Sequence, residues 1–392
     1  DCREYYGRDY KDQGRKMKPD SNINVSNMNV SAVILAAGFS SRMKKFKPLL
    51  PFGSKTMVEK AIELFRENQI SDIVVVTGHK AKLLEPFVEK TGAIPVFNPD
   101  FKSGMLSSIK KGIKNIGSEN HGFFLLPVDI PAIRPSTINL MIRQFQKTKD
   151  HVIIPYFDDK PGHPPLIPFG LKTDILNLKN ESTLRDVLWS RDNRRTPLKV
   201  HDRGILMDAD DERGYEQVCQ KIIALHIPDK KECFSIINEA LPNKDGIRAH
   251  LTDVSFVALK IVTALSDDLN ADLVLAGALL HDILRMEPNH AQAGANLLLN
   301  LGFSEVSKIV AQHMDIKLDL TTPIREKELV YFADKICNEQ GIDLDYHKRF
   351  KDCLIKSPWA RINISRRYEH TKLIQARIEA AAGKSIKEIL SG

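Results

Sequence analysis

Residues 32–37 form an unbroken apolar run, Ala-Val-Ile-Leu-Ala-Ala, that leads directly into a loop of glycine, serine and basic residues. A short apolar run without alternation is typical of a strand that is buried on both faces of a parallel sheet. The loop after such a strand lies at the carboxyl edge of the sheet, where ligands bind in α/β folds. Gly38 lets a ligand approach the backbone closely, and Arg42 and Lys47 supply two positive charges. The pattern therefore predicts a buried strand and a loop that binds a polyanion such as a triphosphate.

The loop does not follow the two best-known phosphate-binding patterns. It is neither Gly-x-x-x-x-Gly-Lys-Ser/Thr nor Gly-x-Gly-x-x-Gly, so the P-loop and dinucleotide-binding interpretations lose support. A short Gly-Ser loop taken alone is as readily a structural turn. The longer pattern of Leu-Ala-Ala-Gly, serine, arginine and a following lysine is far more specific.

Strand and helix patterns alternate as far as residue 223. Strands are predicted at 32–37, 72–77, 94–97, 123–128 and 152–156, with helices near 56–67, 80–90, 104–116 and 135–147. This alternation predicts βαβ units in a doubly wound α/β sheet. The loops that contain Gly38, Gly78, Asn98 and Asp129 would then meet at the carboxyl edge of that sheet.

The chain has 392 residues and is therefore long enough for more than one core. We expect an α/β domain over 29–223, a linker over 224–232, and an all-α domain over 233–392, where helical patterns dominate and no convincing strand is present. Residues 1–28 are polar with few aliphatic side chains, which predicts a disordered tail. Met28, directly before the first strand, is a candidate natural start.

Charge and cysteine content narrow the class of protein. The net charge is +7, but the basic residues are dispersed and not interleaved with aromatics, which favours a polyanionic small substrate over nucleic acid. The five cysteines form no Cys-x-x-Cys pair and are expected to be reduced thiols. No apolar run approaches the ~20 residues of a membrane span. We therefore expect a cytoplasmic protein that binds neither nucleic acid nor membrane.

Two aspartates are candidate ligands of Mg²⁺ in the first domain. Asp129 follows the strand at 123–128, and Asp210 lies between a predicted strand at 205–207 and a predicted helix near 212–223. Mg²⁺ prefers oxygen ligands, often one or two carboxylates together with substrate phosphates. For the acidic cluster around Asp210, a helix cap is the alternative interpretation.

Eight short motifs occur in order along this domain. They are Leu35-Ala36-Ala37-Gly38-x-Ser40-x-Arg42-Met43, Lys47-x-Leu49-Leu50-Pro51, Val76-Thr77-Gly78, Asn98-Pro99, Ser103-Gly104-Met105-x-Ser107-Ser108, Asp129-x-Pro131, Gly162-His163-Pro164 and Asp208-x-Asp210. With these motifs the region resembles the nucleotidyltransferases that act on the molybdenum cofactor, within the larger sugar-nucleotide-transferase-like superfamily. The fold that the resemblance implies is the α/β fold predicted above.

The resemblance also implies roles for individual residues. The nucleotide would be bound by Leu35, Ala36, Ala37, Gly38, Gly78, Ser103, Gly104 and Ser107. Arg42 and Lys47 would neutralise the triphosphate, Asp129 and Asp210 would hold Mg²⁺, and Gly162-His163-Pro164 would lie near the pterin phosphate. Leu-Ala-Ala-Gly is similar to the cytidylyltransferase branch, whereas guanylyltransferases tend to carry Leu-Ala-Gly-Gly. CTP and molybdopterin or molybdenum cofactor are thus the implied substrates, and a molybdoenzyme apoprotein or its chaperone the implied partner. A sugar or polyol phosphate is the alternative acceptor.

The second domain carries a dispersed set of metal-ligand residues. His250, the adjacent pair His281-Asp282 and Asp334 occur in this order, and His250 shares a helical face with apolar residues at 254–265. A single inward histidine is usually a core residue, but four such groups favour a metal site. Imidazole and carboxylate suit Mn, Fe, Co, Ni or Zn.

The order His, His-Asp, Asp resembles the HD-domain metal-dependent phosphohydrolases, with specific matches at 278–283 and 332–335. By that resemblance His290 and His313 stand where two-metal members carry additional histidine ligands. Arg285 stands where many relatives have lysine. The substrate is left open between a phosphomonoester, a nucleotide, and the pyrophosphate or pterin product of the first domain. A regulatory, non-catalytic HD module is the alternative.

Overall fold

The computed structural model describes residues 28–39, 43, 45–179, 181–190, 194–265 and 268–391. The chain divides into two compact units, with the boundary between Leu225 and His226. Arg42, the predicted catalytic arginine, lies outside the described residues, as do residues 1–27 of the predicted tail. Among the described residues no helix is both long enough and apolar enough to cross a membrane.

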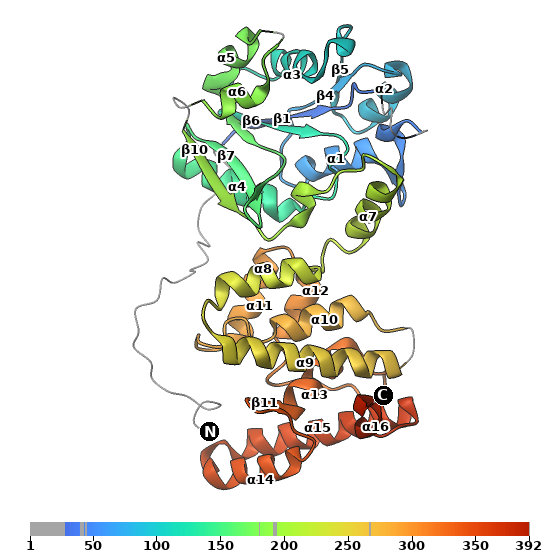
Figure 1. Ribbon diagram of the computed structural model, residues 1–392, viewed down its shortest axis with the longest axis vertical. Helices are drawn as coiled ribbons and strands as arrows, with labels where there is room; N and C mark the ends of the chain where they lie inside the picture. Colours follow the sequence, from blue (N-terminus) through green and yellow to red (C-terminus); the bar gives the residue numbers. More distant parts are fainter. Residues whose placement is uncertain are drawn as a thin grey trace. The chain divides into compact units, whose positions relative to one another are not determined.

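The first unit is built around one mixed sheet, with strand order β10-β7-β9-β6-β1-β4-β5 and β8 paired to β7 (Figure 1). Its strands are β1 (Val30–Leu35), β4 (Ile73–Thr77), β5 (Ile94–Phe97), β6 (Gly122–Pro127), β7 (Val152–Phe157), β8 (Lys160–Pro161), β9 (Leu166–Pro168) and β10 (Arg195–Lys199). Strands β6, β1, β4 and β5 are parallel, and β9 runs antiparallel to both β6 and β7. The α/β fold class is confirmed, but the sheet is mixed and not wholly parallel.

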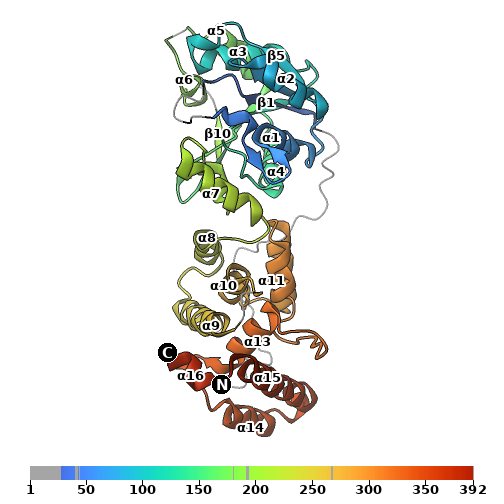
Figure 2. The same ribbon diagram turned by 90° about the vertical axis from the view of Figure 1, so that its right-hand side faces the viewer.

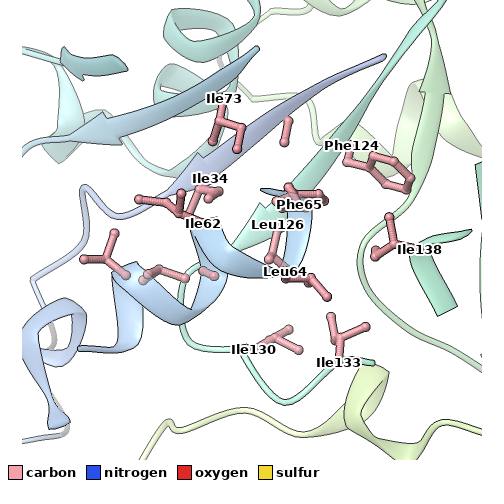
Figure 3. Close-up of a cluster of buried hydrophobic side chains, with 14 of the residues drawn as sticks. Ile34, Ile62, Leu64, Phe65, Ile73, Phe124, Leu126, Ile130, Ile133 and Ile138 are labelled. Atoms are coloured by element: carbon pink, nitrogen blue, oxygen red, sulfur yellow. The ribbon is translucent and has the colours of Figure 1, made fainter. Parts of the chain in front are cut away.

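Helices cover both faces of this sheet. They are α1 (Met57–Arg66), α2 (Ala81–Lys90), α3 (Met105–Lys114), α4 (Pro135–Thr148), α5 (Lys172–Asn177), α6 (Leu184–Leu188) and α7 (Glu212–Ile223), and a hairpin of β2 (Pro51–Phe52) and β3 (Lys55–Thr56) precedes α1. In β1, Ile34 packs with side chains of α1 and α4 on one face, while Val33 packs with α3 on the other. Figure 3 shows Ile34, Phe65, Phe124 and Ile138 in the first of these cores. The apolar run of β1 is therefore buried on both faces, as its pattern predicts.

One predicted strand is wrong. Residues 205–207 do not form a strand, because Arg203–Leu206 form the 3-10 helix η5. The Asp202 carboxylate accepts a hydrogen bond from the backbone N–H of Gly204, and Gly204 packs directly on the Ala132 carbonyl. This local turn chemistry outweighs the apolar sequence Ile-Leu-Met, which predicts a strand only in isolation.

The second unit is helical. It contains α8 (Lys230–Ala240), α9 (Asp245–Ala264), α10 (Ala271–Leu280), α11 (His290–Asn300), α12 (Ser304–Val310), α13 (Glu326–Ile336), α14 (Tyr346–Lys356), α15 (Arg361–Ala382) and α16 (Ile386–Ser391), drawn in yellow to red in Figures 1 and 2. The nearly wholly apolar helix α10 contacts α8, α9, α12 and α13. One short hairpin, β11 (Cys337–Asn338) with β12 (Gly341–Ile342), was not expected from the sequence.

Candidate functional site

A cavity of about 370 Å³ lies at the carboxyl edge of the sheet in the first unit. Its walls come from the loop after β1, from the start of the 3-10 helix η2 (Lys47–Leu49), from residues 101–108, and from the end of β6. The lining residues are Leu35, Ala36, Ala37, Gly38, Phe39, Lys47, Pro48, Phe101, Lys102, Gly104, Met105, Ser108, Pro127, Val128 and Asp129. The cavity therefore lies where the sequence predicts the ligand.

The residues predicted to bind nucleotide fall into two groups. Leu35, Ala36, Ala37, Gly38 and Gly104 line the cavity, whereas Gly78, Ser103 and Ser107 are not among its lining residues.

Ser107 and Gly78 shape the walls instead. The Ser107 hydroxyl lies 2.9 Å from the Asp100 carbonyl and 2.8 Å from the Gly104 carbonyl, either of which can accept its single proton, and it accepts from the Asn98 amide at 3.0 Å. At Gly78 an added Cβ would lie 2.8 Å from the Ala37 carbonyl oxygen, so glycine allows the loops after β1 and β4 to touch.

Lys47 stands between the two predicted magnesium ligands. Its Nζ atom lies 2.7 Å from Asp210 Oδ1 and 3.4 Å from Asp129 Oδ2. Lys47 is buried, with 8% of its surface exposed. Burial raises the pKa of Asp129, the charge of Lys47 opposes this, and the nearby Asp210 raises the pKa further. One ammonium group therefore contacts both carboxylates at the edge of the cavity.

Backbone contacts bring the acidic cluster to this place. The backbone N–H of Ala209 donates to the Asp129 carbonyl at 2.9 Å, which fixes the following residue beside Lys47. The cap of α7 is Asp211, whose side chain accepts from the N–H of Gly214. The cluster thus contains both a helix cap and a carboxylate that faces the cavity lysine, on adjacent residues.

The predicted acceptor-binding segment, Gly162-His163-Pro164, lies shortly before β9 in the chain. Strand β9 pairs antiparallel with β6, with Phe124 opposite Leu166, and Leu125 N–H donates to the Pro165 carbonyl. The segment itself contacts β7 and η5, because Gly162 N–H donates to the Pro155 carbonyl at 2.8 Å and His163 N–H donates to the Ile205 carbonyl at 3.0 Å. His163 Nδ1 is buried, and no hydrogen-bond partner for it exists among the described residues. Burial lowers the pKa of His163.

A cluster of histidines and aspartates forms the second site. His250 on α9, His281 directly after α10 and Asp334 on α13 converge, with Nε2–Nε2 at 3.3 Å and the two Nε2 atoms 3.2 and 3.5 Å from Asp334 Oδ1. All three residues are buried. Their ligand atoms are near enough to one another to hold a single metal ion.

A second triad lies next to the first. His290 Nε2 and His313 Nε2 are 3.1 Å apart, and they lie 3.3 and 3.2 Å from Asp282 Oδ1. The other oxygen, Asp282 Oδ2, is 3.7 Å from His281 Nε2. Asp282 therefore presents one oxygen to each triad.

Hydrogen bonds fix which histidine nitrogens face the centre. His281 Nδ1 lies 2.8 Å from the Ala278 carbonyl and His313 Nδ1 lies 2.7 Å from the Val310 carbonyl. A carbonyl oxygen only accepts, so each Nδ1 donates and each neutral ring presents the lone pair of Nε2 to the cluster. Lone pairs and carboxylates that converge in a buried space fit a cation at their centre.

The carboxylates of the cluster are held ionised. Burial raises the pKa of Asp282 and of Asp334, but neighbouring charges and hydrogen bonds bring both pKa values well below the usual range. His281 is the main charge acting on Asp282, and Lys335 is the main charge acting on Asp334. Carboxylates that stay charged in a buried site are prepared to bind a metal ion.

Two cations reinforce this site from outside the triads. Arg285, which stands where many relatives have lysine, contacts the site directly. Its Nη1 atom donates to Asp282 Oδ2 at 2.8 Å. Lys335 Nζ contacts the Asp334 carboxylate and donates to the His313 carbonyl at 3.2 Å. Lys335 was not predicted as a site residue, although it belongs to the motif at 332–335, because its position next to Asp334 in the sequence does not reveal a contact with His313.

Known protein families match a segment of each unit. Residues 32–195 match the MobA-like NTP transferase domain, and residues 247–339 match the HD domain. The chain combines a MobA-like NTP transferase domain with an HD domain. The expected nucleotidyltransferase fold followed by a helical HD region is thus confirmed.

Individual relatives resemble the first domain. The molybdenum cofactor cytidylyltransferase of Escherichia coli K12 is 27% identical over 182 residues, which is 46% of this chain and 91% of that protein. A probable molybdenum cofactor guanylyltransferase of Natranaerobius thermophilus is 35% identical over 130 residues, 32% of this chain and 60% of its own length. A solved nucleotidyl transferase from Methanothermobacter is 21% identical with a TM-score of 0.44, covering 50% of this chain and 98% of that one.

Proposed function

We propose that the MobA-like domain transfers CMP from CTP to the terminal phosphate of molybdopterin or molybdenum cofactor and releases pyrophosphate. The observation that carries this proposal is the cavity that has Ala36, Ala37 and Gly38 on one wall and Lys47 with Asp129 at another. It offers a Gly loop for the nucleotide together with cationic and anionic groups for phosphates and Mg²⁺. The similarity to the E. coli cytidylyltransferase over 91% of that protein supports the choice of reaction.

Each charged residue has a defined task in this reaction. A terminal phosphate oxygen of the acceptor attacks the α-phosphorus of CTP, and the bond to the pyrophosphate oxygen breaks. Lys47 and Arg42 stabilise the negative charge that develops on the phosphate oxygens. Asp129 and Asp210 would hold Mg²⁺, which neutralises phosphate charge when it is bound. The protein forms no covalent bond, because positioning and charge stabilisation suffice for such a displacement.

Cytosine is the proposed base because Ala36 and Ala37 both line the cavity. Ala37 carries a methyl group where the guanylyltransferase pattern Leu-Ala-Gly-Gly has the hydrogen of a glycine, whereas Ala36 is alanine in both patterns. A methyl group leaves less room for a purine and favours the smaller pyrimidine.

The HD domain is proposed to hydrolyse a phosphoester at its two triads. His250, His281 and Asp334 would hold one transition-metal ion, and His290 and His313 would hold a second, with Asp282 shared between them. Metal ions in such a site lower the pKa of bound water and polarise a phosphate. Mn, Fe, Co, Ni or Zn fit the imidazole and carboxylate ligands.

The transferase proposal is tested by pyrophosphate release. Full-length protein with Mg²⁺ is incubated with each of the four NTPs, with molybdopterin, with molybdenum cofactor, or with a panel of sugar and polyol phosphates. We expect release only with CTP and a pterin acceptor. Release that requires GTP contradicts the base assignment, and release that requires a sugar or polyol phosphate contradicts the acceptor.

The hydrolase proposal is tested on the same protein after metal analysis. We expect bound transition metal and phosphate release from at least one of a phosphomonoester, a nucleotide or pyrophosphate. His250→Gln should lose the metal ion of its own triad together with the phosphate release. Metal-free protein that hydrolyses none of these would favour a regulatory HD module.

A further inference from the structure

Three large apolar side chains, Phe39, Phe101 and Met105, line the transferase cavity. Phe39 leaves 50% of its surface exposed and Met105 leaves 64%. Single exposed apolar residues are common on proteins, but here they gather in the cavity that also contains Lys47 and Asp129. The cavity thus offers an apolar surface in addition to its charged groups.

Other rings, contributed by neighbouring loops, hold Phe39 in place. Its ring centroid lies 5.2 Å from that of Phe101 and 5.3 Å from that of His79. The three rings belong to the loop after β1, the 3-10 helix η3 (Phe101–Ser103) and the loop after β4. These distances lie in the range of favourable aromatic pairs. The half-exposed ring therefore has fixed aromatic neighbours.

Gly78 maintains the position of Phe101 in this group. A Cβ at position 78 would lie 2.8 Å from both Cβ and Cγ of Phe101. The backbone of the loop after β4 thus approaches the Phe101 side chain more closely than any other residue would allow. This contact gives Gly78, predicted to bind nucleotide, an indirect role in building the cavity wall.

We infer that Phe39, supported by Phe101, is a stacking platform for a flat heteroaromatic ring of a substrate. The inference rests on the proposed function and adds which part of a substrate Phe39 contacts. Both proposed substrates join a heteroaromatic ring, cytosine or pterin, to phosphate groups, and the cavity has both kinds of surface for them. Stacking on an aromatic side chain is favourable for any such ring, because each has a π-face.

The test compares Phe39→Ala and Phe39→Trp in the full-length protein with Phe97→Ala as the matched control. Phe97 is a phenylalanine of nearly the same exposure, 49%, at the end of β5, and it is not among the cavity-lining residues. Calorimetry measures the affinity for CTP and for inorganic tripolyphosphate with Mg²⁺. Steady-state pyrophosphate release gives the KM for the pterin acceptor. Circular dichroism checks that each variant is folded.

Phe39→Ala is expected to weaken one of two parameters about tenfold, in the range of a lost base–aromatic stack. Weaker CTP binding identifies cytosine as the stacked ring, and a higher acceptor KM identifies the pterin. Tripolyphosphate affinity should stay within about twofold, Phe39→Trp should retain wild-type values, and Phe97→Ala should change neither.

Two results would contradict the proposal that Phe39 is a stacking platform. One is a Phe39→Ala variant that differs from Phe97→Ala in neither parameter. The other is an equal loss of CTP and tripolyphosphate affinity, which would show that the loop acts on the phosphates. If the wild type binds CTP through Phe39 but does not transfer CMP to a pterin acceptor, the proposed function fails and the platform stands.

Discussion

Lys47 Nζ lies 2.7 Å from Asp210 Oδ1, although 163 positions separate the two residues in the sequence. The same ammonium group lies 3.4 Å from Asp129, so one buried cation faces two carboxylates from two different loops. The side chains of Lys47 and Asp129 are largely buried, whereas that of Asp210 is 41% exposed, so removal of Lys47 leaves chiefly Asp129 without a compensating charge. The three residues therefore behave as one electrostatic unit.

Lys47→Met is expected to lower kcat/KM for pyrophosphate release by about 100-fold or more, as for other losses of a group that stabilises transition-state charge. The variant also loses the charge that opposes the raised pKa of Asp129. Lys55→Met is the control, since Lys55 pairs with Glu63 on α1 and is absent from the cavity lining. Equal activity of the two variants would remove Lys47 from the mechanism.

Substitution of Asp282 should affect both metal triads, whereas substitution of one histidine should affect only its own triad. We expect full-length wild type to bind two transition-metal ions per chain, measured by elemental analysis after loading with Mn²⁺. His290→Gln should retain the ion held by His250, His281 and Asp334, whereas Asp282→Ala should lose both, because Asp282 presents one oxygen to each triad. A variant of Asp282 that keeps as much metal as His290→Gln would show that the carboxylate is not shared.

Metal affinity of the HD domain should rise with pH. Burial lowers the pKa of His281, but Asp282 and Asp334 outweigh burial and raise the pKa above its ordinary value of 6.5. In the metal-free protein this raised pKa stabilises the fold fully below about pH 6.5, and the contribution is lost as the pH rises through the folded-state value. A metal ion binds only neutral imidazole, so its affinity should increase over the same window.

Competition with a chelator of known affinity measures this pH dependence. Calorimetry in buffers with different ionisation enthalpies counts the protons that metal binding releases. Proton release that is zero above and below pH 6.5 would contradict a protonated His281 in the metal-free site.

The central sheet was readable from sequence because β1 and β4 are short, apolar and buried on both faces, with helical patterns between them. Strands β9 and β10 were missed, since β9 has only three residues and β10 has exposed Arg195, Pro197 and Lys199 at alternate positions, with a proline at its centre. The strand predicted at 205–207 failed because a hydrogen bond from Gly204 N–H to Asp202 controls the turn. Local side-chain bonding of this kind is invisible to a pattern of apolar residues.

The two sites differed in how much of their geometry the sequence revealed. The HD residues were found because His281-Asp282 and Asp334 lie in recognisable motifs, and the structure brings them together with His250. Phe39 had no such signal, because its role depends on rings from three separate loops. Residues of this kind can be identified only from tertiary contacts, because the order of residues along the chain does not reveal which rings lie together.

Gly162→Ala should destabilise the first unit, because the added Cβ would lie 2.6 Å from the Ile205 carbonyl oxygen. That carbonyl also accepts the backbone hydrogen bond of His163 at 3.0 Å, so the clash displaces the predicted acceptor-binding segment. Overpacking of this kind costs about 1–3 kcal/mol in free energy of unfolding. Pterin-dependent pyrophosphate release should fall together with stability.

Gly170→Ala is the matched control, since an added Cβ there meets no atom within 4 Å and should change stability by less than about 0.5 kcal/mol. The chain contains two tryptophans, Trp189 in the first unit and Trp359 in the second. In a Trp359→Phe background, the fluorescence of Trp189 during urea unfolding therefore reports on the first unit alone. Coincident unfolding curves for Gly162→Ala and Gly170→Ala would show that the loop around His163 accommodates the added methyl group without a loss in free energy of unfolding. The close contact with Ile205 would then not determine the position of this loop.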